Sequence, residues 1–215
     1  MLLNPLQIPA GETKVVFALT DSKETLQRYP YKFNLAINYR LEDNRLHVIW
    51  HVENTDDKTI YFQIGGHPAF NLPDIKAGEP VNGRLHFDTD NPIRRCATVK
   101  GCLDNARHET VETHDGIWNF TDSSFENDAL VFDHCQLHHI ELLNAENKTE
   151  VSVDFKAPAV GIWTPHGKNA PFICIEPWYG VADVAAFEGD IRDRYLMNQL
   201  LPGASFMAQY TITIG

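Results

Sequence analysis

The chain has 215 residues, of which 43% are hydrophobic and 11% aromatic, so it is long and apolar enough to bury a sizeable core. Its formal net charge of -11 argues against a nucleic-acid partner and against an anionic membrane surface. We find neither a signal peptide nor an apolar stretch of membrane-spanning length, and therefore expect a cytoplasmic protein without a membrane partner.

Strands are predicted along nearly the whole chain, because short alternating runs are separated by turn residues. The first is expected over residues 14–19, followed by a helical turn over 21–27. A hairpin is predicted to join residues 33–41 to 46–52, and a second to join 46–52 to 59–64. The later strands are expected over residues 84–87, 116–120, 129–132, 139–143 paired with 151–155, 161–164, 171–175 and 206–214.

The spacing of these strands, about one in every ten residues, is typical of an antiparallel sandwich or barrel. We find no long amphipathic helix, internal repeat, linker or low-complexity segment. The sequence therefore predicts a single all-β domain over residues 1–215.

The four cysteines are expected to be reduced thiols. Cys96, Cys102, Cys135 and Cys174 show neither a close paired metal spacing nor a disulfide framework. Cys135 and Cys174 stand in apolar stretches, and we predict that both are small core residues of strands.

The stretch over residues 64–73, Ile-Gly-Gly-His-Pro-Ala-Phe-Asn-Leu-Pro, is the first candidate for a functional motif. Gly65 and Gly66 can take backbone angles closed to other residues, and Pro68 restricts the residue before it. His67 is therefore expected on a stiff turn at a strand end, where functional side chains often gather.

The second candidate motif contains Glu176. The apolar run over residues 172–175 delivers this carboxylate to a Pro-Trp-Tyr-Gly stretch. His67 and Glu176, each at a strand end and each flanked by aromatic residues, would form a proton-transfer pair if the fold brings them together.

Three stretches resemble the aldose 1-epimerase (mutarotase) superfamily, in particular its LacX-like branch: residues 21–33, 64–73 and 174–183. The resemblance runs from about residue 14 to the C-terminus. It implies a large, twisted antiparallel β-sandwich of the galactose-mutarotase type, with a sugar site on a concave face. It also implies interconversion of the α and β anomers of a hexose or a hexose phosphate.

The resemblance also assigns roles to residues. His67 falls on the catalytic acid of the family and Glu176 on its catalytic base. A substrate-binding aspartate of the family falls on Asp128, and Asp133 is an alternative match. Asp128 could otherwise simply cap a turn before its strand. From residue type and neighbourhood, we expect Phe70 and Trp178 to stack on a sugar and Asn71 to meet its hydroxyls; Trp178 is otherwise a core residue.

Anomer exchange through the open chain needs a base for the C1 hydroxyl proton and an acid for the ring oxygen. Mutual attraction is expected to hold His67 charged and Glu176 ionised. This chemistry requires no metal, nucleotide or other cofactor, and the implied partner is a small sugar or sugar phosphate.

The run over residues 133–139 contains three histidines, a cysteine and an aspartate, which resembles a metal site. In an extended strand, however, His134 and His138 would share one face while His139 would face the other. A zinc site needs a matching distant pair of ligands, which the sequence does not show. Surface histidines are the favoured interpretation.

One departure from the family pattern concerns the beginning of the chain. Nothing in residues 1–20 matches the upstream segment that carries another histidine and an arginine in the family, so we expect a sandwich that lacks its N-terminal strands. Such a sheet would expose an edge, which predicts either self-association or a partner that supplies the missing part. Two functions stay open: an epimerase, and a non-catalytic carbohydrate-binding or degenerate family member without those substrate-binding residues.

Overall fold

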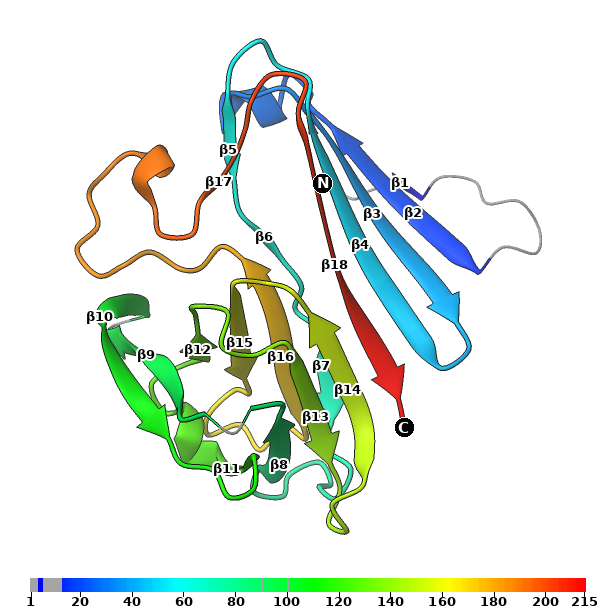
Figure 1. The fold of residues 1–215 in the computed structure, drawn as a ribbon, viewed down its shortest axis with the longest axis vertical. Helices are drawn as coiled ribbons and strands as arrows, with labels where there is room; N and C mark the ends of the chain where they lie inside the picture. The colour runs from blue at the N-terminus through cyan, green and yellow to red at the C-terminus, as the bar shows by residue number, and fades with distance from the viewer. Residues whose placement is uncertain (1–3, 6–12, 90, 100) are drawn as a thin grey trace.

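The computed structural model describes residues 4–5, 13–89, 91–99 and 101–215, and these are mostly β-structure (Figure 1). The strands form a nine-stranded sheet, a seven-stranded sheet and a two-stranded ribbon, and the paired strands run antiparallel. The predicted all-β antiparallel fold is therefore confirmed. None of the helices in the described part of the chain is long and apolar enough to cross a membrane.

The nine-stranded sheet contains both ends of the described chain. Its C-terminal strand lies between the N-terminal hairpin and the second half of the molecule. In spatial order the strands are β1 (Asn4–Pro5), β2 (Lys14–Thr20), β3 (Phe33–Glu42), β4 (Arg45–Asn54), β18 (Ser205–Ile214), β14 (Thr149–Phe155), β13 (His139–Leu143), β8 (Asn82–Phe87) and β11 (Ile117–Thr121).

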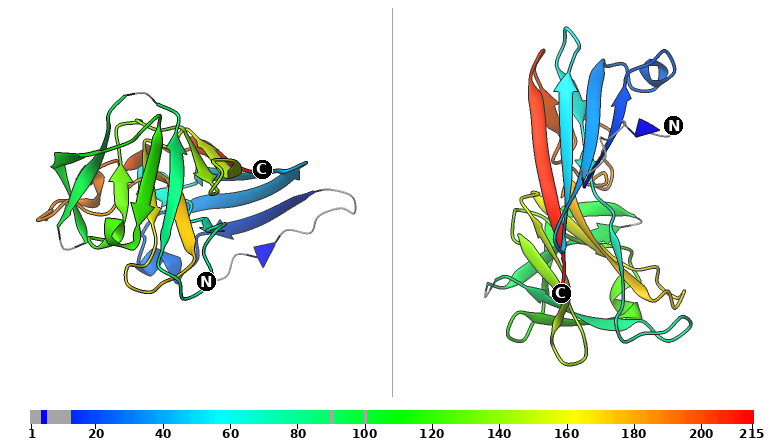
Figure 2. Two further views of the ribbon diagram at one scale, coloured as in Figure 1. Left: turned by 90° about the horizontal axis from the view of Figure 1, so that it is seen from below. Right: turned by 90° about the vertical axis from the view of Figure 1, so that its right-hand side faces the viewer.

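The seven-stranded sheet lies against the second half of the first sheet, and Figure 2 shows β2–β4 extending beyond the stacked region. One of its edges consists of two short strands that both pair with the same neighbour. In order the strands are β10 (Cys102–Val111), β9 (Ile93–Val99), β12 (Leu130–Phe132), β15 (Ala159–Trp163), β16 (Phe172–Tyr179), and then β6 (Ile64–Gly65) with β7 (Ala69–Asn71).

The remaining elements are short. β5 (Ile60–Phe62) and β17 (Asn198–Leu200) form the ribbon, which covers a small apolar cluster around Val52. Three single turns of 3-10 helix complete the described structure: η1 (Thr25–Gln27), η2 (Asp122–Phe125) and η3 (Ile191–Asp193).

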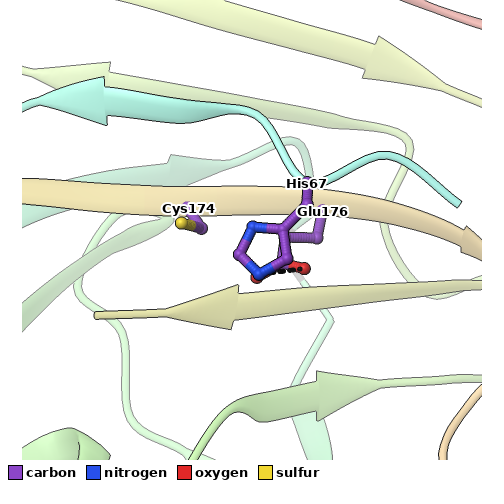
Figure 3. A group of neighbouring side chains, drawn as sticks. All are labelled: His67, Cys174 and Glu176. Atoms are coloured by element: carbon purple, nitrogen blue, oxygen red, sulfur yellow. Dashed lines mark ion pairs between the residues drawn. The ribbon is translucent and has the colours of Figure 1, made fainter. Parts of the chain in front are cut away.

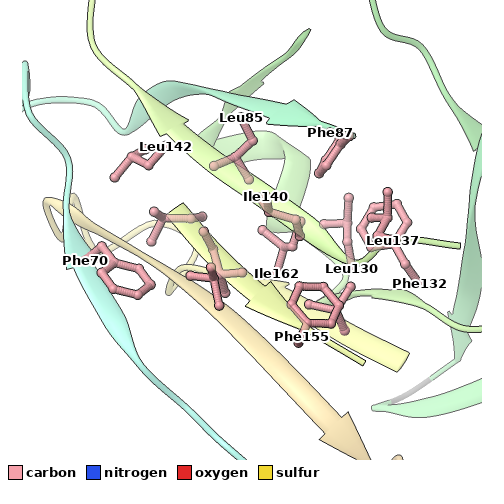
Figure 4. Packing of buried hydrophobic residues seen from close by; sticks show 14 of the residues in the cluster. Phe70, Leu85, Phe87, Leu130, Phe132, Leu137, Ile140, Leu142, Phe155 and Ile162 are labelled. Atoms are coloured by element: carbon pink, nitrogen blue, oxygen red, sulfur yellow. The ribbon is translucent and has the colours of Figure 1, made fainter. Parts of the chain in front are cut away.

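The main core fills the space between the two large sheets (Figure 4). Leu85, Ile140 and Ile162 are fully buried there, and so is Ile175 of β16. Side chains alternate between the faces of a strand, so β16 presents Ile173 and Ile175 to this core and turns Glu176 to the opposite face. Burying a side chain of this size contributes about 1.5–3 kcal/mol.

Two of the three predicted hairpins are confirmed, and one is wrong. β3 pairs with β4, and β13 pairs with β14. β4, however, takes β18 as its second neighbour, and β5 pairs with β17 instead of β4. The turn after β4 is held away from a hairpin by Asn54, whose side-chain amide donates to the Leu200 carbonyl at 2.8 Å.

The stretch after β12 also differs from the expectation. Residues 133–138 form a turn and not a strand, and His134 and Cys135 both take left-handed backbone angles, with φ of 60° and 54°. Cys135 is therefore exposed and not a core residue. Cys174 is buried in β16 as expected, and all four cysteines are free.

Candidate active site

His67 lies in the short connection between β6 and β7, and both flanking strands pair with β16. Gly65 is opposite Trp178 and Ala69 is opposite Cys174. Counting inward from either pair places His67 opposite Glu176. The fold thus brings together the two residues of the predicted proton-transfer pair, which lie 109 positions apart in the sequence.

Backbone hydrogen bonds hold this connection to β16 on both sides of the histidine. The Gly66 N–H donates to the Pro177 carbonyl at 3.0 Å, and the Ile175 N–H donates to the Pro68 carbonyl at 3.3 Å. Pro68 and Pro177 have no N–H to add to the ladder, which explains why the regular pairing is interrupted at the histidine.

Gly65 and Gly66 are required for close packing and not for unusual backbone angles. A Cβ atom on Gly65 would lie 2.6 Å from Cδ1 of Trp178, and one on Gly66 would lie 2.8 Å from the ring of Tyr210. Both distances are shorter than side chains tolerate, so any larger residue would push these rings out of place.

His67 and Glu176 form a close pair with opposite exposures (Figure 3). Nε2 of His67 lies 3.4 Å from Oε2 of Glu176, and the two side chains are 63% and 3% exposed. The imidazole also meets the Trp163 ring edge to face, with 5.9 Å between the centroids. A carboxylate beneath an accessible imidazole is a suitable arrangement for acid–base catalysis.

Burial raises the pKa of Glu176 to about 7, an effect that hydrogen bonding from Trp178 opposes and the charge of Asp128 reinforces. We expected attraction to His67 to keep this carboxylate ionised. That expectation was wrong, because the desolvation of the buried carboxyl group outweighs its favourable contacts. The carboxyl group therefore changes its charge near neutral pH.

The indole of Trp178 spans the sheet beside Glu176. Cβ atoms built on Gly65 and Gly161 would lie 2.6 and 2.5 Å from opposite ends of the ring, so these two glycines provide the space that it occupies. Trp178 is partly exposed, and its buried part packs against the cluster that contains Cys96, Val131 and Ala159. With His67 and Glu176, it lines a hollow of about 440 Å³.

Asp128 lies close enough to Glu176 for its charge to raise the pKa of that carboxyl group. It is exposed and takes a left-handed backbone angle, with φ of 79°, just before β12. The alternative, Asp133, is fully buried and accepts a hydrogen bond from the hydroxyl of Tyr195 at 2.7 Å. The structure therefore associates Asp128, and not Asp133, with the acid–base pair.

The two residues of β7 that we expected to contact a sugar differ in their exposure. Phe70 is 8% exposed and packs in the main core, so the expectation that it stacks on a sugar was wrong. Sequence alternation predicts that Phe70 and Asn71 face opposite ways, but it does not say which faces inward. Asn71 is exposed opposite Phe172, about 13 Å along β16 from Glu176.

Two further residues at the pair were not expected from the sequence. Trp163 is opposite Cys174 on β15, and the thiol of Cys174 lies within 4.8 Å of the nearest ligating atoms of His67 and Glu176. These three donors could together hold a metal ion; burial, with a smaller contribution from the charge of Glu176, raises the pKa of the Cys174 thiol to about 12. Only the register between β15 and β16 reveals Trp163, whereas Cys174 shares a face with Glu176 because it lies two residues earlier in the same strand.

A larger hollow, of about 900 Å³, lies elsewhere on the molecule over β14 and β18. It contains none of the residues expected in the site, whereas the smaller hollow contains His67, Glu176 and Trp178. Converging acid–base groups are better evidence of a site than volume, so we take the smaller hollow as the candidate.

Comparison with known proteins gives consistent results. Residues 5–190 match the family described as Aldose 1-epimerase. Protein LacX (chromosomal) of Lactococcus lactis subsp. lactis is 28% identical over 212 residues, which span 95% of this chain and 69% of LacX.

Solved structures extend this likeness to the fold. A galactose mutarotase related enzyme from Lactobacillus acidophilus superposes with a TM-score of 0.88 at 32% sequence identity. The superposition covers 99% of this chain and 71% of the Lactobacillus chain. A galactose mutarotase-like protein from Lactobacillus casei gives a TM-score of 0.89 at 24% identity, covering 99% and 73%.

Proposed function

Because the chain belongs to the aldose 1-epimerase family, we propose that it interconverts the α and β anomers of a hexose, with His67 as general acid and Glu176 as general base. The observation that carries this proposal is the 3.4 Å approach of the two side chains at an open hollow. The C1 hydroxyl oxygen and the ring oxygen are bonded to the same carbon, so their acid and base must lie close together.

In the proposed reaction, Glu176 takes the proton of the C1 hydroxyl while His67 protonates the ring oxygen and the C1–O bond breaks. Rotation about the C1–C2 bond presents the other face of the aldehyde. The ring then closes as Glu176 returns its proton and His67 recovers its own. A carboxyl pKa of about 7 suits a base that must both accept and return a proton near neutral pH.

The surroundings of the pair support a sugar as substrate. The exposed part of Trp178 offers an apolar surface for a sugar ring, and the nearby Asp128 offers a carboxylate for hydrogen bonding. Among the residues described here, the lining of the hollow includes neither lysine nor arginine. This favours a free hexose over a hexose phosphate, because phosphate recognition normally uses such cations.

The test is anomer exchange, followed by polarimetry or NMR, in wild type, His67→Asn and Glu176→Gln. We expect each substitution to lower the catalysed rate by about 10²–10⁴-fold. Glu188→Gln and His166→Asn, which replace exposed residues, serve as matched controls and should leave the rate unchanged.

A different outcome would favour the second candidate function. If the wild type and both site variants match the uncatalysed rate while a hexose still binds, the chain is a carbohydrate-binding member of the family and the catalytic proposal is wrong.

A further inference from the structure

A second group of reactive side chains lies on the same face of the seven-stranded sheet as Glu176. Cys96, His108 and Asp133 place a sulfur, a ring nitrogen and a carboxylate oxygen within 4.8 Å of one another. Nε2 of His108 lies 2.9 Å from Oδ1 of Asp133 and 3.5 Å from Sγ of Cys96. Cys96 and Asp133 are fully buried, and the His108 side chain is 14% exposed.

The register of the sheet brings these residues together. Glu176 is opposite Gly161, Gly161 is opposite Val131, Val131 is opposite Cys96, and Cys96 is opposite His108. Side chains of directly paired residues share one face, so the group lies on the face of the candidate active site. Three strand spacings separate Cys96 from Glu176, a distance of about 14 Å. The group is therefore separate from the acid–base pair.

The carboxylate of Asp133 is oriented by a residue outside the group. The hydroxyl of Tyr195 donates to its Oδ2 at 2.7 Å, which leaves Oδ1 directed toward His108. Hydrogen bonds of this kind commonly fix the ligating carboxylates of metal sites. The chain then turns sharply through the left-handed residues His134 and Cys135.

That turn places a second histidine at the open side of the group. Nε2 of His134 lies 3.5 Å from Oδ2 of Asp133, and its ring centroid lies 5.3 Å from that of His108. The His134 side chain is 64% exposed, so it is free to rotate toward an ion held by the other three donors.

We propose that Cys96, His108, Asp133 and His134 form a binding site for a zinc-type divalent transition metal. Two imidazoles, one thiolate and one carboxylate match the preferences of zinc. Zinc–ligand distances of about 2.0–2.3 Å in a tetrahedron place ligand atoms roughly 3.3–3.7 Å apart. The sulfur–nitrogen distance of 3.5 Å falls in this range, and the 2.9 Å contact needs only a small opening.

The site joins the histidine-rich turn to a distant pair of ligands. His134 and Asp133 belong to the run of residues that resembled a metal site, and Cys96 and His108 come from β9 and β10. Burial and the neighbouring Asp133 raise the pKa of the Cys96 thiol to about 12, so a bound metal ion must displace this proton to solvent before the sulfur becomes a thiolate ligand. The thiolate ligand makes the site selective for ions that bind sulfur well, such as zinc, over calcium and magnesium.

The experiment is a titration of the chelator-treated full chain with Co²⁺, observed by absorption spectroscopy. We expect one Co²⁺ per chain, a thiolate-to-cobalt charge-transfer band in the near ultraviolet, and the intense visible bands of tetrahedral Co²⁺. Added Zn²⁺ should remove all of these bands by displacement. Absence of the charge-transfer band, or weak bands typical of octahedral coordination, would overturn the proposal.

Substitutions locate the ion. Cys96→Ser should abolish the charge-transfer band, whereas Cys102→Ser, which replaces a neighbouring cysteine of β10 outside the group, should retain it. Loss of the band in Cys174→Ser instead would place the ion at the acid–base pair and refute this site. His134→Ala removes an exposed side chain without disturbing the core, and it should weaken Co²⁺ binding at least tenfold; unchanged affinity would refute its assignment as a ligand.

Discussion

Glu176 shows how one buried carboxyl group can weaken the fold. Its carboxyl group is almost completely buried, and its pKa is raised from an ordinary value of 4.5 to about 7. Between these two pH values the folded chain binds more protons at this position than the unfolded chain does. The free energy of unfolding therefore falls as pH rises from 4.5 to about 7, and this loss persists at higher pH.

Glu176→Gln should remove this penalty while it abolishes catalysis. We expect the variant to be more stable than wild type by on the order of 1–3 kcal/mol at about pH 8, and equally stable near pH 4. Chemical denaturation at the two pH values measures the difference. A variant that is less stable than wild type at pH 8 would show that the carboxylate forms net favourable contacts.

Gly161 provides the space for one end of the Trp178 ring, since a Cβ atom there would lie 2.5 Å from the indole. Gly161→Ala should displace the ring from the Glu176 carboxylate, lower the epimerase rate and destabilise the fold by about 1–3 kcal/mol. Adding Trp178→Phe to Gly161→Ala should restore part of the lost stability, because the smaller ring leaves room for the methyl group.

A double-mutant cycle of unfolding free energies measures this coupling. Strictly additive effects of Gly161→Ala and Trp178→Phe would show that the ring does not depend on the glycine.

At the residue scale, the sequence identified side chains that belong to recognisable local motifs. It missed the side chains that reach the site only because two strands pair in a particular register. His67 and Glu176 stand in distinctive contexts of prolines, glycines and aromatics. Trp163 and Gly161 have no such context. They reach the site because β15 pairs with β16 in one particular register, which no local pattern specifies.

At the scale of elements, β8, β13 and β14 carry a ladder of charged side chains across their outer face. His86 contacts Glu141 at 2.7 Å, and His139 contacts Asp154 at 2.7 Å and Glu141 at 3.7 Å. Burial lowers the pKa of His139, but its hydrogen bond to Asp154 and the nearby carboxylates outweigh this and leave the pKa raised. Hydrogen bonds from Thr149 and His86 similarly overcome burial and lower the pKa of Glu141.

The two shifts define a pH window for this ladder. The Glu141 contribution is present above its ordinary pKa of 4.5 and is lost as pH falls below it. The His139 contribution is complete below 6.5 and is lost as pH rises through the raised pKa of the folded state. The ladder should therefore stabilise the sheet most between these values.

His139→Gln should cost on the order of 0.5 kcal/mol at about pH 5.5 and less at about pH 8.5, as measured by urea unfolding. The neighbouring His138 is exposed and forms no ion pair with any residue in the described ranges, so His138→Gln is the matched control and should not reproduce this loss. Equal losses for His139→Gln at both pH values would contradict the assignment.

Element prediction failed where pairing depends on residues far away in the chain. β9 and β10 were missed because runs of consecutive polar residues, such as those around Arg95 and Glu109, interrupt the alternation that is typical of a half-buried strand. These two side chains pair with each other across the hairpin at 2.7 Å. The prediction of a hairpin after residue 52 was wrong because β18, from the C-terminus, pairs with β4 where β5 was expected.

At the scale of the whole molecule, the N-terminal edge of the nine-stranded sheet remains our predicted site of self-association. In the part of the chain that the structure describes, β2 pairs on its outer side with Asn4 and Pro5 of β1. Val15 of β2 is 38% exposed and Leu41 of β3 is 50% exposed. Edges with exposed apolar side chains favour pairing with another chain.

Light scattering after size exclusion should therefore give a mass above the 24.4 kDa of one chain. Val15→Lys adds a charge at this edge and should shift the protein toward monomer, while Lys23→Arg, a substitution of an exposed residue that retains the charge, should not. A wild type that is monomeric across the accessible concentration range would contradict the prediction.

The attachment of both Glu176 and the His67 segment to the one strand β16 has a consequence for durability. Glu176 belongs to β16, and the segment carrying His67 is bonded to the same strand on either side of the histidine. Since β16 also supplies Ile173 and Ile175 to the core, the strand that positions both side chains is held in place by the packing of the two sheets. On heating, loss of turnover should coincide with the calorimetric melting of the whole protein and not precede it.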